Sequence, residues 1–377
     1  MAPQDERPRD EIIVRYLVDV PGSDIDAVAA ALAVEQSVEM PLAAIRHPHV
    51  LQDIVGRVRS VSPAGGGGFE VELGLASATV DEDPAQLLNM VFGNCSLLPH
   101  VELVDLELPP SVVSALGGPR WGIEGLRRLV GAQSRPLTCT ALKPLGLGPA
   151  DLAELASTFA SAGIDLIKDD HGFAGQHSAP FAARLASCQE AVERANQRTG
   201  GSSRYVPSLV GSPASLHRQA ALACDAGVRV VLVAPMLVGM ATFAELVAAH
   251  PDLAFLGHPA FAGAQRIGPP LLLGSLFRLY GADAVIFPNY GGRFTYGVET
   301  CAAIAERSRR PWSGVRPTLP VPAGGMTVER VEEMVDFYGA DVVLLIGGAL
   351  LSAGDQLAAR SRQFVAAVGD SHRERVA

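Results

Sequence analysis

One stretch of the sequence ends an apolar run abruptly on four polar side chains. The residues Gly163-Ile-Asp-Leu-Ile are followed at once by Lys168, Asp169, Asp170 and His171. Buried charges at this density carry a large desolvation cost unless they are paired or bind a metal. The stretch therefore predicts either a catalytic or metal site at the end of a strand, or a salt-bridged loop without chemistry.

The two carboxylates are expected to differ in role. Asp169 and Asp170 are consecutive, and consecutive side chains of an extended segment point to opposite sides. One of them should lie beside Lys168 at the site and the other in a structural ion pair. His171 could add a nitrogen ligand to a metal site, although imidazole is softer than Mg²⁺ prefers. A structural capping role for His171 is the alternative.

Further polar groups follow other apolar segments. Lys143, which precedes a proline, could act as a general base or bind an oxyanion, or it could be a solvated loop lysine. His258 ends another segment as a possible site donor, with a structural histidine as the alternative. Arg293 lies on a glycine-flexed loop that could close over an anion, and an ordinary surface arginine is the alternative there.

Two glycine pairs indicate a phosphate site. Gly324-Gly325 and Gly347-Gly348 each follow a short apolar segment near the end of the chain. Backbone N–H groups exposed by glycine after the last two strands of a barrel form a phosphate cradle. Simple turn chemistry is the alternative, but two pairs at this place favour phosphate.

The elements that would position these groups alternate regularly from residue 136 onward. Eight strands are predicted, at 137–142, 164–168, 204–209, 228–234, 253–257, 284–287, 319–321 and 342–346. The helices predicted between them include 149–162, 213–226, 269–280 and 328–338. Eight such units close a (β/α)8 TIM barrel, whose active site lies at the C-terminal ends of the strands. An open doubly wound sheet is the alternative.

The N-terminal part follows a different order. Strands are predicted at 11–20, 50–58, 69–76 and 101–108, and helices at 25–37 and 83–90. The order β-α-β-β-α-β predicts a ferredoxin-like α+β domain. We therefore expect an α/β protein with this domain at 1–110 and the barrel at 111–377.

The composition limits the classes of protein. With 377 residues, 48% of them hydrophobic, the chain can bury a large core. Its formal net charge of −10 disfavours nucleic-acid and anionic membrane partners but permits a small anionic substrate. The five cysteines are scattered without CxxC spacing, which indicates a reducing compartment. No signal peptide or membrane span is visible, so we expect a cytoplasmic protein.

These residues together resemble the RuBisCO superfamily over nearly the whole chain. The stretch from Gly163 to His171 is similar to the family motif that ends in Lys-Asp-Asp-Glu. The resemblance implies that CO₂ carbamylates Lys168, which then binds Mg²⁺ together with Asp170. His171 stands where the family has its glutamate ligand.

Other segments carry the resemblance further. Thr140-Ala-Leu-Lys143-Pro is similar to the segment of the enolisation lysine, His258 to a catalytic histidine, and the two glycine pairs to the phosphate loops. Trp121-Gly-Ile-Glu-Gly-Leu-Arg matches the segment that leads into the barrel. Glu35 and Asn94 match segments that the family inserts into the neighbouring subunit's active site. The resemblance thus implies a homodimer with shared active sites.

Three departures from the family pattern argue against CO₂ fixation. Leu145 stands in place of a second lysine, Pro259 in place of an arginine, and Phe287 in place of a histidine. The resemblance is therefore to the RuBisCO-like proteins (form IV), which are not carboxylases.

The implied activity is Mg²⁺-dependent enolate chemistry on a monophosphorylated keto-sugar or keto-acid. Lys143 would move a proton beside the ketone, and Arg293 would contact the substrate. We expect decarboxylation of a 3-oxo sugar-acid phosphate of the 3-oxo-isoapionate 4-phosphate type. The alternatives are an enolase or isomerase of methionine-salvage phosphates, and a non-catalytic protein that binds a phosphorylated metabolite.

Overall fold

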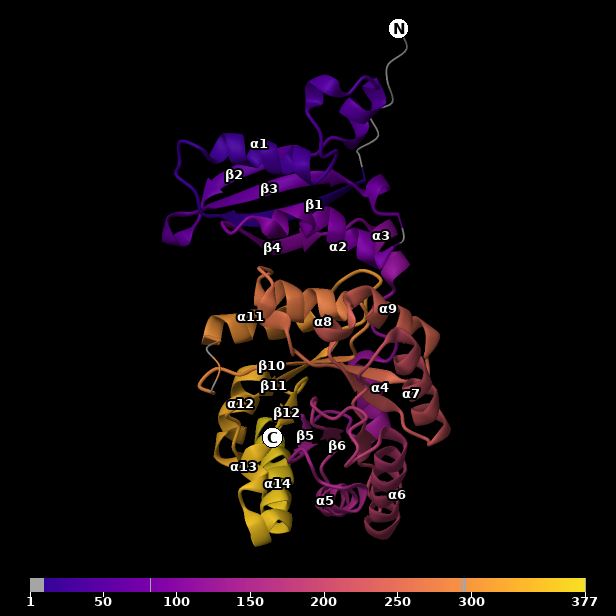
Figure 1. Cartoon of the computed structure of the whole chain (residues 1–377). Coiled ribbons are helices and arrows are strands. Elements are labelled where there is room, and N and C mark those ends of the chain that lie inside the picture. Colours follow the sequence, from indigo (N-terminus) through magenta and orange to yellow (C-terminus); the bar gives the residue numbers. More distant parts are fainter. Residues whose placement is uncertain (1–9, 82, 293, 295, 377) are drawn as a thin grey trace. The chain divides into compact units, whose positions relative to one another are not determined.

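The computed structural model describes residues 10–81, 83–292, 294 and 296–376 of the chain, which divides into two compact units (Figure 1). The first unit comprises Met1–Leu116 and Gly263–Leu272, and the second Gly117–Ala262 and Leu273–Ala377. The first unit thus extends beyond the expected boundary at residue 110 and includes a segment from the second half of the chain. None of the helices in the described part is long and apolar enough to cross a membrane.

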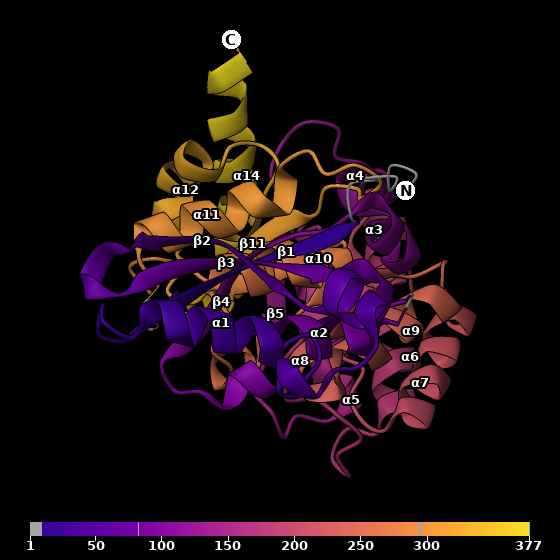
Figure 2. The ribbon, with the colours of Figure 1, turned by 90° about the horizontal axis from the view of Figure 1, so that it is seen from above.

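The first unit is built on an antiparallel sheet with the strand order β2-β3-β1-β4. Buried and less buried residues alternate along β1, as expected for a strand with one face on a core. Helix α1 packs against β2 and β3 (Figure 2). The elements are β1 (Glu11–Val18), α1 (Ile25–Glu35), β2 (Arg57–Pro63), β3 (Phe69–Ala76), α2 (Pro84–Phe92) and β4 (Val101–Glu107). This order confirms the predicted ferredoxin-like arrangement.

The predicted strand at 50–58 is wrong over most of its length. Val50–Ile54 forms a π-helical turn, and β2 begins only at Arg57. Two physical reasons explain the error. The apolar residues at 50 and 54 recur at helical spacing, and β2 is an edge strand with mostly exposed residues, so it shows no apolar face in the sequence.

The second unit holds eight parallel strands in two four-stranded sheets, β12-β5-β6-β7 and β8-β9-β10-β11. A bridge between Ser208 and Leu232 joins β7 to β8, and β11 lies against β12, which closes the barrel. The strands are β5 (Leu137–Leu142), β6 (Leu166–Asp169), β7 (Arg204–Val206), β8 (Val230–Val233), β9 (Ala254–Gly257), β10 (Ala284–Pro288), β11 (Leu319–Ala323) and β12 (Val343–Leu345). The predicted TIM barrel is confirmed.

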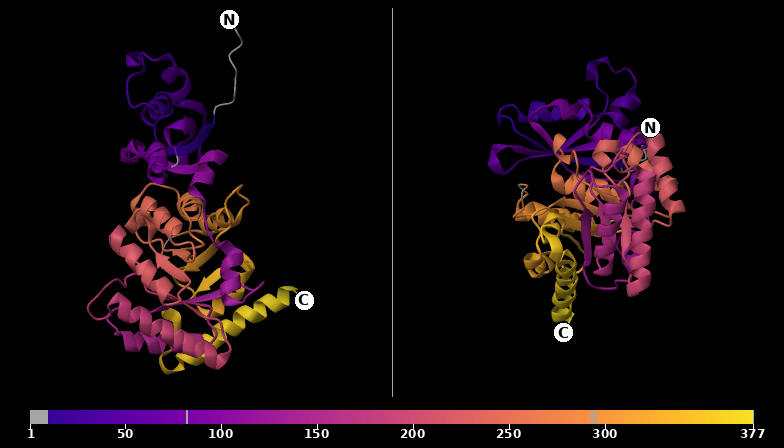
Figure 3. Two further views of the ribbon diagram at one scale, coloured as in Figure 1. Left: turned by 90° about the vertical axis from the view of Figure 1, so that its right-hand side faces the viewer. Right: turned by 60° about the horizontal axis from the view of Figure 1, so that its bottom comes forward.

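Helices surround this barrel. C-terminal helix α14, yellow in Figure 3, lies beside α12 and α5. The longer helices are α4 (Gly122–Val130), α5 (Pro149–Ser161), α6 (Phe181–Thr199), α7 (Pro213–Asp225), α9 (Met240–Ala249), α11 (Val298–Arg309), α12 (Val331–Tyr338) and α14 (Leu357–Val376). The predicted helix at 269–280 is a π-helical turn over Pro270–Leu276 followed by the short helix α10 (Phe277–Leu279).

The barrel interior is a packed apolar core to which every strand contributes, with residues such as Leu137, Leu166 and Val321 fully buried. Two buried carboxylates fix the N-terminal ends of strands. Asp165 accepts hydrogen bonds from Arg135 and Thr138, and Asp283 accepts three from backbone N–H groups. Because the core is apolar and these carboxylates are already paired, side chains available for chemistry lie where the strands end.

Candidate active site

The ends of β5 and β6 bring the first two candidate residues together. These strands pair in parallel, with Leu142 opposite Asp169, so the residues that follow them emerge side by side. Lys143 Nζ lies 2.9 Å from Asp170 Oδ2. The lysine side chain is 38% exposed and the aspartate side chain 12%. An accessible amine is therefore held against a largely buried carboxylate at the barrel mouth.

Lys168 is buried behind this pair. It is 3% exposed, and its Nζ donates a hydrogen bond to the backbone oxygen of Asp169 at 2.8 Å. Burial lowers the pKa of Lys168, because the charged amine loses its hydration, although the nearby Asp170 opposes the shift. The structure thus favours the neutral amine here more than at a surface lysine.

Asp169 serves the structure and points away from the mouth. Its carboxylate, fully buried, accepts hydrogen bonds from Arg184 Nε at 2.9 Å, Tyr205 Oη at 2.8 Å and the backbone N–H of Ser208 at 3.1 Å. Burial raises the pKa of Asp169, while Arg184 acts in the opposite direction. One carboxylate of the pair is structural, as expected from the strand alternation. Its partner Arg184 lies in α6 and carries no recognisable signal in the sequence.

Asp170 is the carboxylate that remains at the site. Its Oδ1 accepts a hydrogen bond from the backbone N–H of His171 at 3.1 Å and lies 3.2 Å from His171 Nδ1. Burial alone would raise the pKa of Asp170, but hydrogen bonds from His171 and Lys143 outweigh it and bring the pKa below the usual range. Asp170 is therefore an ionised carboxylate at any physiological pH.

His258 joins the cluster from the end of β9, which belongs to the other four-stranded sheet. Its ring stacks on that of His171, with centroids 4.1 Å apart and planes 14° apart. Its Nδ1 accepts a hydrogen bond from the backbone N–H of Ala260 at 3.1 Å, which places the ring proton on Nε2. Burial, together with nearby Lys168, lowers the pKa of His258 to about 2. The structure thus holds His258 as a neutral imidazole.

The glycine pairs follow β11 and β12, as expected. Gly324 and Gly325 have φ angles of +82° and +77°, and a Cβ on Gly325 would come within 2.5 Å of Gly292 Cα. Only glycine fits this left-handed, closely approached turn. Gly347 precedes the short helix α13 (Gly348–Leu351), and a Cβ on Gly348 would meet nothing within 4 Å. Arg293, on the neighbouring loop, lies outside the described residues.

Glu35 and Asn94 belong to the first unit, where the fold brings them together. Asn94 Nδ2 donates a hydrogen bond to Glu35 Oε1 at 2.8 Å. The neighbouring Gln36 fixes both segments, because it donates to the backbone oxygen of Met90 and accepts from the backbone N–H of Cys95. The two predicted residues thus form one exposed polar pair.

Comparison with known proteins identifies the family. Residues 122–367 match the model of the ribulose bisphosphate carboxylase large chain, catalytic domain. The chain belongs to this family. Ribulose bisphosphate carboxylase-like protein 1 of Rhodopseudomonas palustris is 50% identical over 95% of this chain and 98% of the relative. The 5-methylthioribulose-1-phosphate isomerase of Rhodospirillum rubrum is also 50% identical, over 95% of this chain and 96% of the relative.

Solved structures agree with this assignment. The Rubisco-like protein from Rhodopseudomonas palustris has a TM-score of 0.90 at 47% identity and covers 97% of this chain and 98% of its own. Octameric RuBisCO from Pyrococcus horikoshii has a TM-score of 0.91 at 24% identity, covering 98% of this chain and 90% of its own, and shows a shared fold. The expected RuBisCO-like protein, an enzyme of the lyase or isomerase class, is confirmed.

The structure adds two residues near the mouth of this RuBisCO-like barrel. Asn289, which follows β10, is fully buried and accepts a 2.6 Å hydrogen bond from Tyr338 Oη, so it is structural. Phe261, in the turn after β9, is 60% exposed and has a φ of +69°. No sequence signal predicts a left-handed phenylalanine, since that conformation is characteristic of glycine and asparagine.

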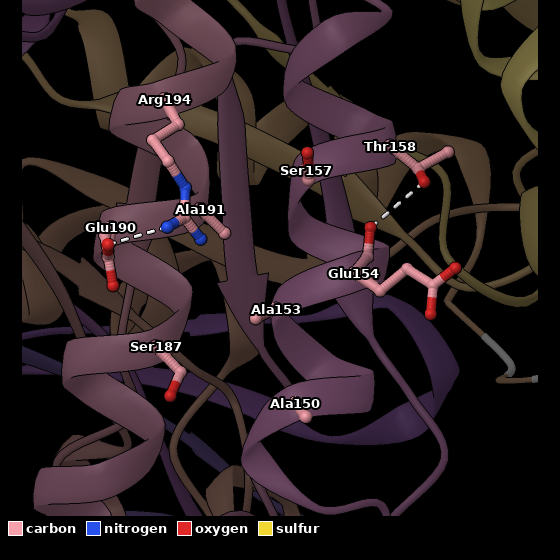
Figure 4. Close-up of a pocket in the computed structure, with 9 residues that line it drawn as sticks. All are labelled: Ala150, Ala153, Glu154, Ser157, Thr158, Ser187, Glu190, Ala191 and Arg194. Atoms are coloured by element: carbon pink, nitrogen blue, oxygen red, sulfur yellow. Dashed lines mark hydrogen bonds and ion pairs between the residues drawn. The ribbon is translucent and has the colours of Figure 1, made fainter.

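Two hollows adjoin the barrel helices. A cavity of about 880 Å³ extends from Lys143 between α5 and the segment that begins α14. A groove of about 440 Å³ runs between α5 and α6, where Figure 4 shows Arg194 paired with Glu190 on one side and Glu154 and Thr158 on the other. This groove contains none of the predicted site residues, so we place the candidate active site at the mouth.

Proposed function

We propose that this RuBisCO-like enzyme isomerises a monophosphorylated ketose of the 5-methylthioribulose 1-phosphate type. The reaction removes a proton from the carbon beside the ketone and returns a proton to the former carbonyl carbon of the resulting enediolate. The ketone thereby moves to the neighbouring carbon, and no second substrate is needed. The observation that carries the proposal is the pair formed by Lys143 and Asp170, 2.9 Å apart at the barrel mouth. The relative named 5-methylthioribulose-1-phosphate isomerase, which is 50% identical over 95% of this chain, supports the choice of substrate.

Lys143 is the residue that moves the proton. Both lysines of the cluster carry amines, but Lys168 is 3% exposed whereas the Lys143 side chain is 38% exposed and can meet a substrate. Asp170 holds the Lys143 amine in place. A positioned general acid or base of this kind contributes a rate factor of about 10² to 10⁴.

The chain's residues fit a Mg²⁺ ion if Lys168 is carbamylated. Within the described residues no three His, Cys, Asp or Glu side chains are grouped to hold a metal, and the cluster offers Asp170 and His171 as ligands. A free Lys168 amine donates a hydrogen bond, but a carbamate formed with CO₂ would add an oxygen ligand. Burial favours the neutral amine, the form that reacts with CO₂. Mg²⁺ would supply Lewis-acid stabilisation of the enolate charge.

The glycine turns would bind the substrate's phosphate, and Arg293 would contact the substrate. Glycines after the last two barrel strands leave backbone N–H groups open to an anion. The space beside Gly348, where a Cβ would meet nothing within 4 Å, leaves room for such a ligand. We further propose a homodimer in which Glu35 and Asn94 complete the active site of the other subunit.

Neither carboxylation nor decarboxylation is the function we propose. Leu145, which is 50% exposed at the mouth, offers no charge for a second phosphate. The names of the relatives favour an isomerase or enolase over a decarboxylase. They include the 2,3-diketo-5-methylthiopentyl-1-phosphate enolase of Bacillus licheniformis, which is 30% identical over 95% of this chain and 91% of the relative.

Solvent exchange followed by NMR tests the proposal. The enzyme, supplied with Mg²⁺ and bicarbonate, is incubated with 5-methylthioribulose 1-phosphate in D₂O. We expect an isomeric ketose phosphate that carries solvent deuterium. Lys143→Met should slow exchange by about 10² to 10⁴-fold, whereas Glu193→Gln, a change at an exposed residue of α6, should leave exchange unchanged.

Two other results would overturn the proposal. Release of CO₂ from 3-oxo-isoapionate 4-phosphate, without deuterium entering the methylthio ketose, would identify a decarboxylase. Binding of phosphorylated ketoses without exchange at any of them would identify a non-catalytic binding protein. Calorimetric titration with Mg²⁺, with and without bicarbonate, tests the metal site independently of turnover, because carbamylation of Lys168 should tighten Mg²⁺ binding.

A further inference from the structure

The turn after β9 presents a phenyl ring to solvent in a strained backbone conformation. His258 to Ala262 form a turn in which the Ala262 N–H donates to the Pro259 oxygen at 3.0 Å. Phe261 occupies the position before the last residue of this turn, with φ at +69°. A β-turn with positive φ there favours glycine or asparagine.

This conformation is unfavourable for phenylalanine, and the ring gains little burial in return. Phe261 is 60% exposed, so packing does not account for a bulky side chain at a position suited to glycine. Strained residues of this kind concentrate at ligand-binding and catalytic sites, where the strain maintains a required geometry. The left-handed conformation of Phe261, which packing does not explain, therefore supports contact with a ligand.

The position of Phe261 relates the ring to the chemistry. It lies three residues beyond His258, whose ring stacks on His171 at the barrel mouth. Exposed large apolar side chains also follow three other strands of this barrel: Leu145 after β5, Leu237 after β8 and Phe294 after β10.

We propose that the ring of Phe261 receives the apolar end of the substrate and makes the enzyme select a thioether or alkyl end over a hydroxyl or a second phosphate. This inference rests on the proposed function and specifies which end of the ketose the turn after β9 recognises. A thioether suits the ring, because divalent sulfur makes favourable contacts with aromatic rings. Pro259, in the same turn, adds no charge that could hold an anion.

Two substitutions distinguish the effect of the Phe261 ring from the effect of its backbone conformation. Phe261→Gly and Phe261→Asn both remove the ring and both suit the left-handed conformation. Each protein should therefore keep a melting temperature equal to or above that of the wild type. Leu222→Asn is the matched control, since Leu222 is an exposed apolar residue, 45% exposed, on α7 rather than on the rim.

The measured quantity is the ratio of kcat/KM for 5-methylthioribulose 1-phosphate to that for ribulose 1-phosphate, in which a hydroxyl replaces the methylthio group. We expect the wild type to prefer the methylthio substrate and both Phe261 variants to lose about ten- to a hundredfold of that preference. Leu222→Asn should keep the wild-type ratio.

Failure of the inference and failure of the proposed function give different results. If folded Phe261 variants keep the wild-type ratio, the ring does not select the apolar end, and the isomerase assignment stands. If the wild type exchanges no deuterium into either ketose, the proposed function itself fails. A wild type that turns over both ketoses equally well would also overturn the inference, because there would be no preference to assign.

Discussion

The rings of His171 and His258 stack with centroids 4.1 Å apart, although the two residues follow different strands, β6 and β9. The Ala260 N–H and burial keep His258 neutral, so this ring offers its face to His171 without charge repulsion. The stack ties two loops together across the barrel mouth and holds His171 beside Asp170.

The protonation of His258 predicts a pH dependence of stability. Its pKa is about 2 in the folded protein, below the value of about 6.5 in an unfolded chain. Unfolding therefore takes up a proton below pH 6.5, and stability is lost as the pH falls, by at most about 1.4 kcal/mol per pH unit. Melting temperatures measured with EDTA from pH 7 to pH 5 should fall more steeply for the wild type than for His258→Gln. His177→Gln, at an exposed residue, should match the wild type, and equal slopes in all three would contradict the prediction.

The pair of Lys143 and Asp170 predicts coupled losses of activity. Lys143→Met should reduce kcat by about 10² to 10⁴-fold. Asp170→Asn should cost at least as much, because it releases the Lys143 amine and also removes one of the ligands proposed for Mg²⁺. Since the two residues act as a unit, the double variant should lose little more than Asp170→Asn alone. Steady-state kinetics measures kcat for all three variants. If the losses of kcat in the two single variants multiply in the double variant, the 2.9 Å contact between Lys143 and Asp170 has no part in turnover.

The buried ion pair between Asp169 and Arg184 predicts a large loss of stability. Both side chains are 0% exposed, so Asp169→Ala leaves an uncompensated buried charge and should cost about 3–5 kcal/mol in the free energy of unfolding. Glu190→Ala, which breaks an exposed pair with Arg194 on the same helix, should cost about 0.5 kcal/mol or less. Denaturant unfolding measures both, and similar costs would argue against a structural role for Asp169.

The burial of the cysteine side chains predicts a single accessible thiol in the folded protein. Cys95, Cys139, Cys188 and Cys301 are buried, whereas Cys224 is only partly buried. Burial raises the pKa of Cys139 to about 12, which suppresses the reactive thiolate. A thiol reagent should label about one cysteine of the native chain and all five after denaturation. Cys224→Ser should remove the native labelling, and its persistence would contradict this burial pattern.

The proposed sharing of active sites predicts complementation between subunits. Glu35→Gln and Lys143→Met should each inactivate the homodimer. Mixed dimers hold one intact site, so an equal mixture that exchanges subunits should recover about a quarter of wild-type activity. A chain carrying both substitutions should not complement Lys143→Met. Mixed dimers seen by native mass spectrometry without recovered activity would refute sharing.

The sequence by itself determined the architecture and the place of the site. Strand and helix patterns repeat locally, and parallel strands must end at one face, so Lys143, Lys168 and His258 could be assigned to the barrel mouth from their positions after strands. The glycine pairs could be placed in the same way. The edge strand β2 was misplaced because its exposed residues give no apolar period, and most of the helix predicted at 269–280 is a π-helical turn.

Tertiary structure decided how the site residues are arranged. Whether Asp169 or Asp170 faces the mouth depends on the pairing of β6 with its neighbours and on Arg184, which arrives from α6. The stack of His171 on His258 and the left-handed Phe261 likewise depend on loops from separate strands. The local sequence determines which chemical groups are present and which strand each of them follows. The burial of these groups and the positions of their hydrogen-bond partners, which set their charge and orientation, arise only when distant segments pack together.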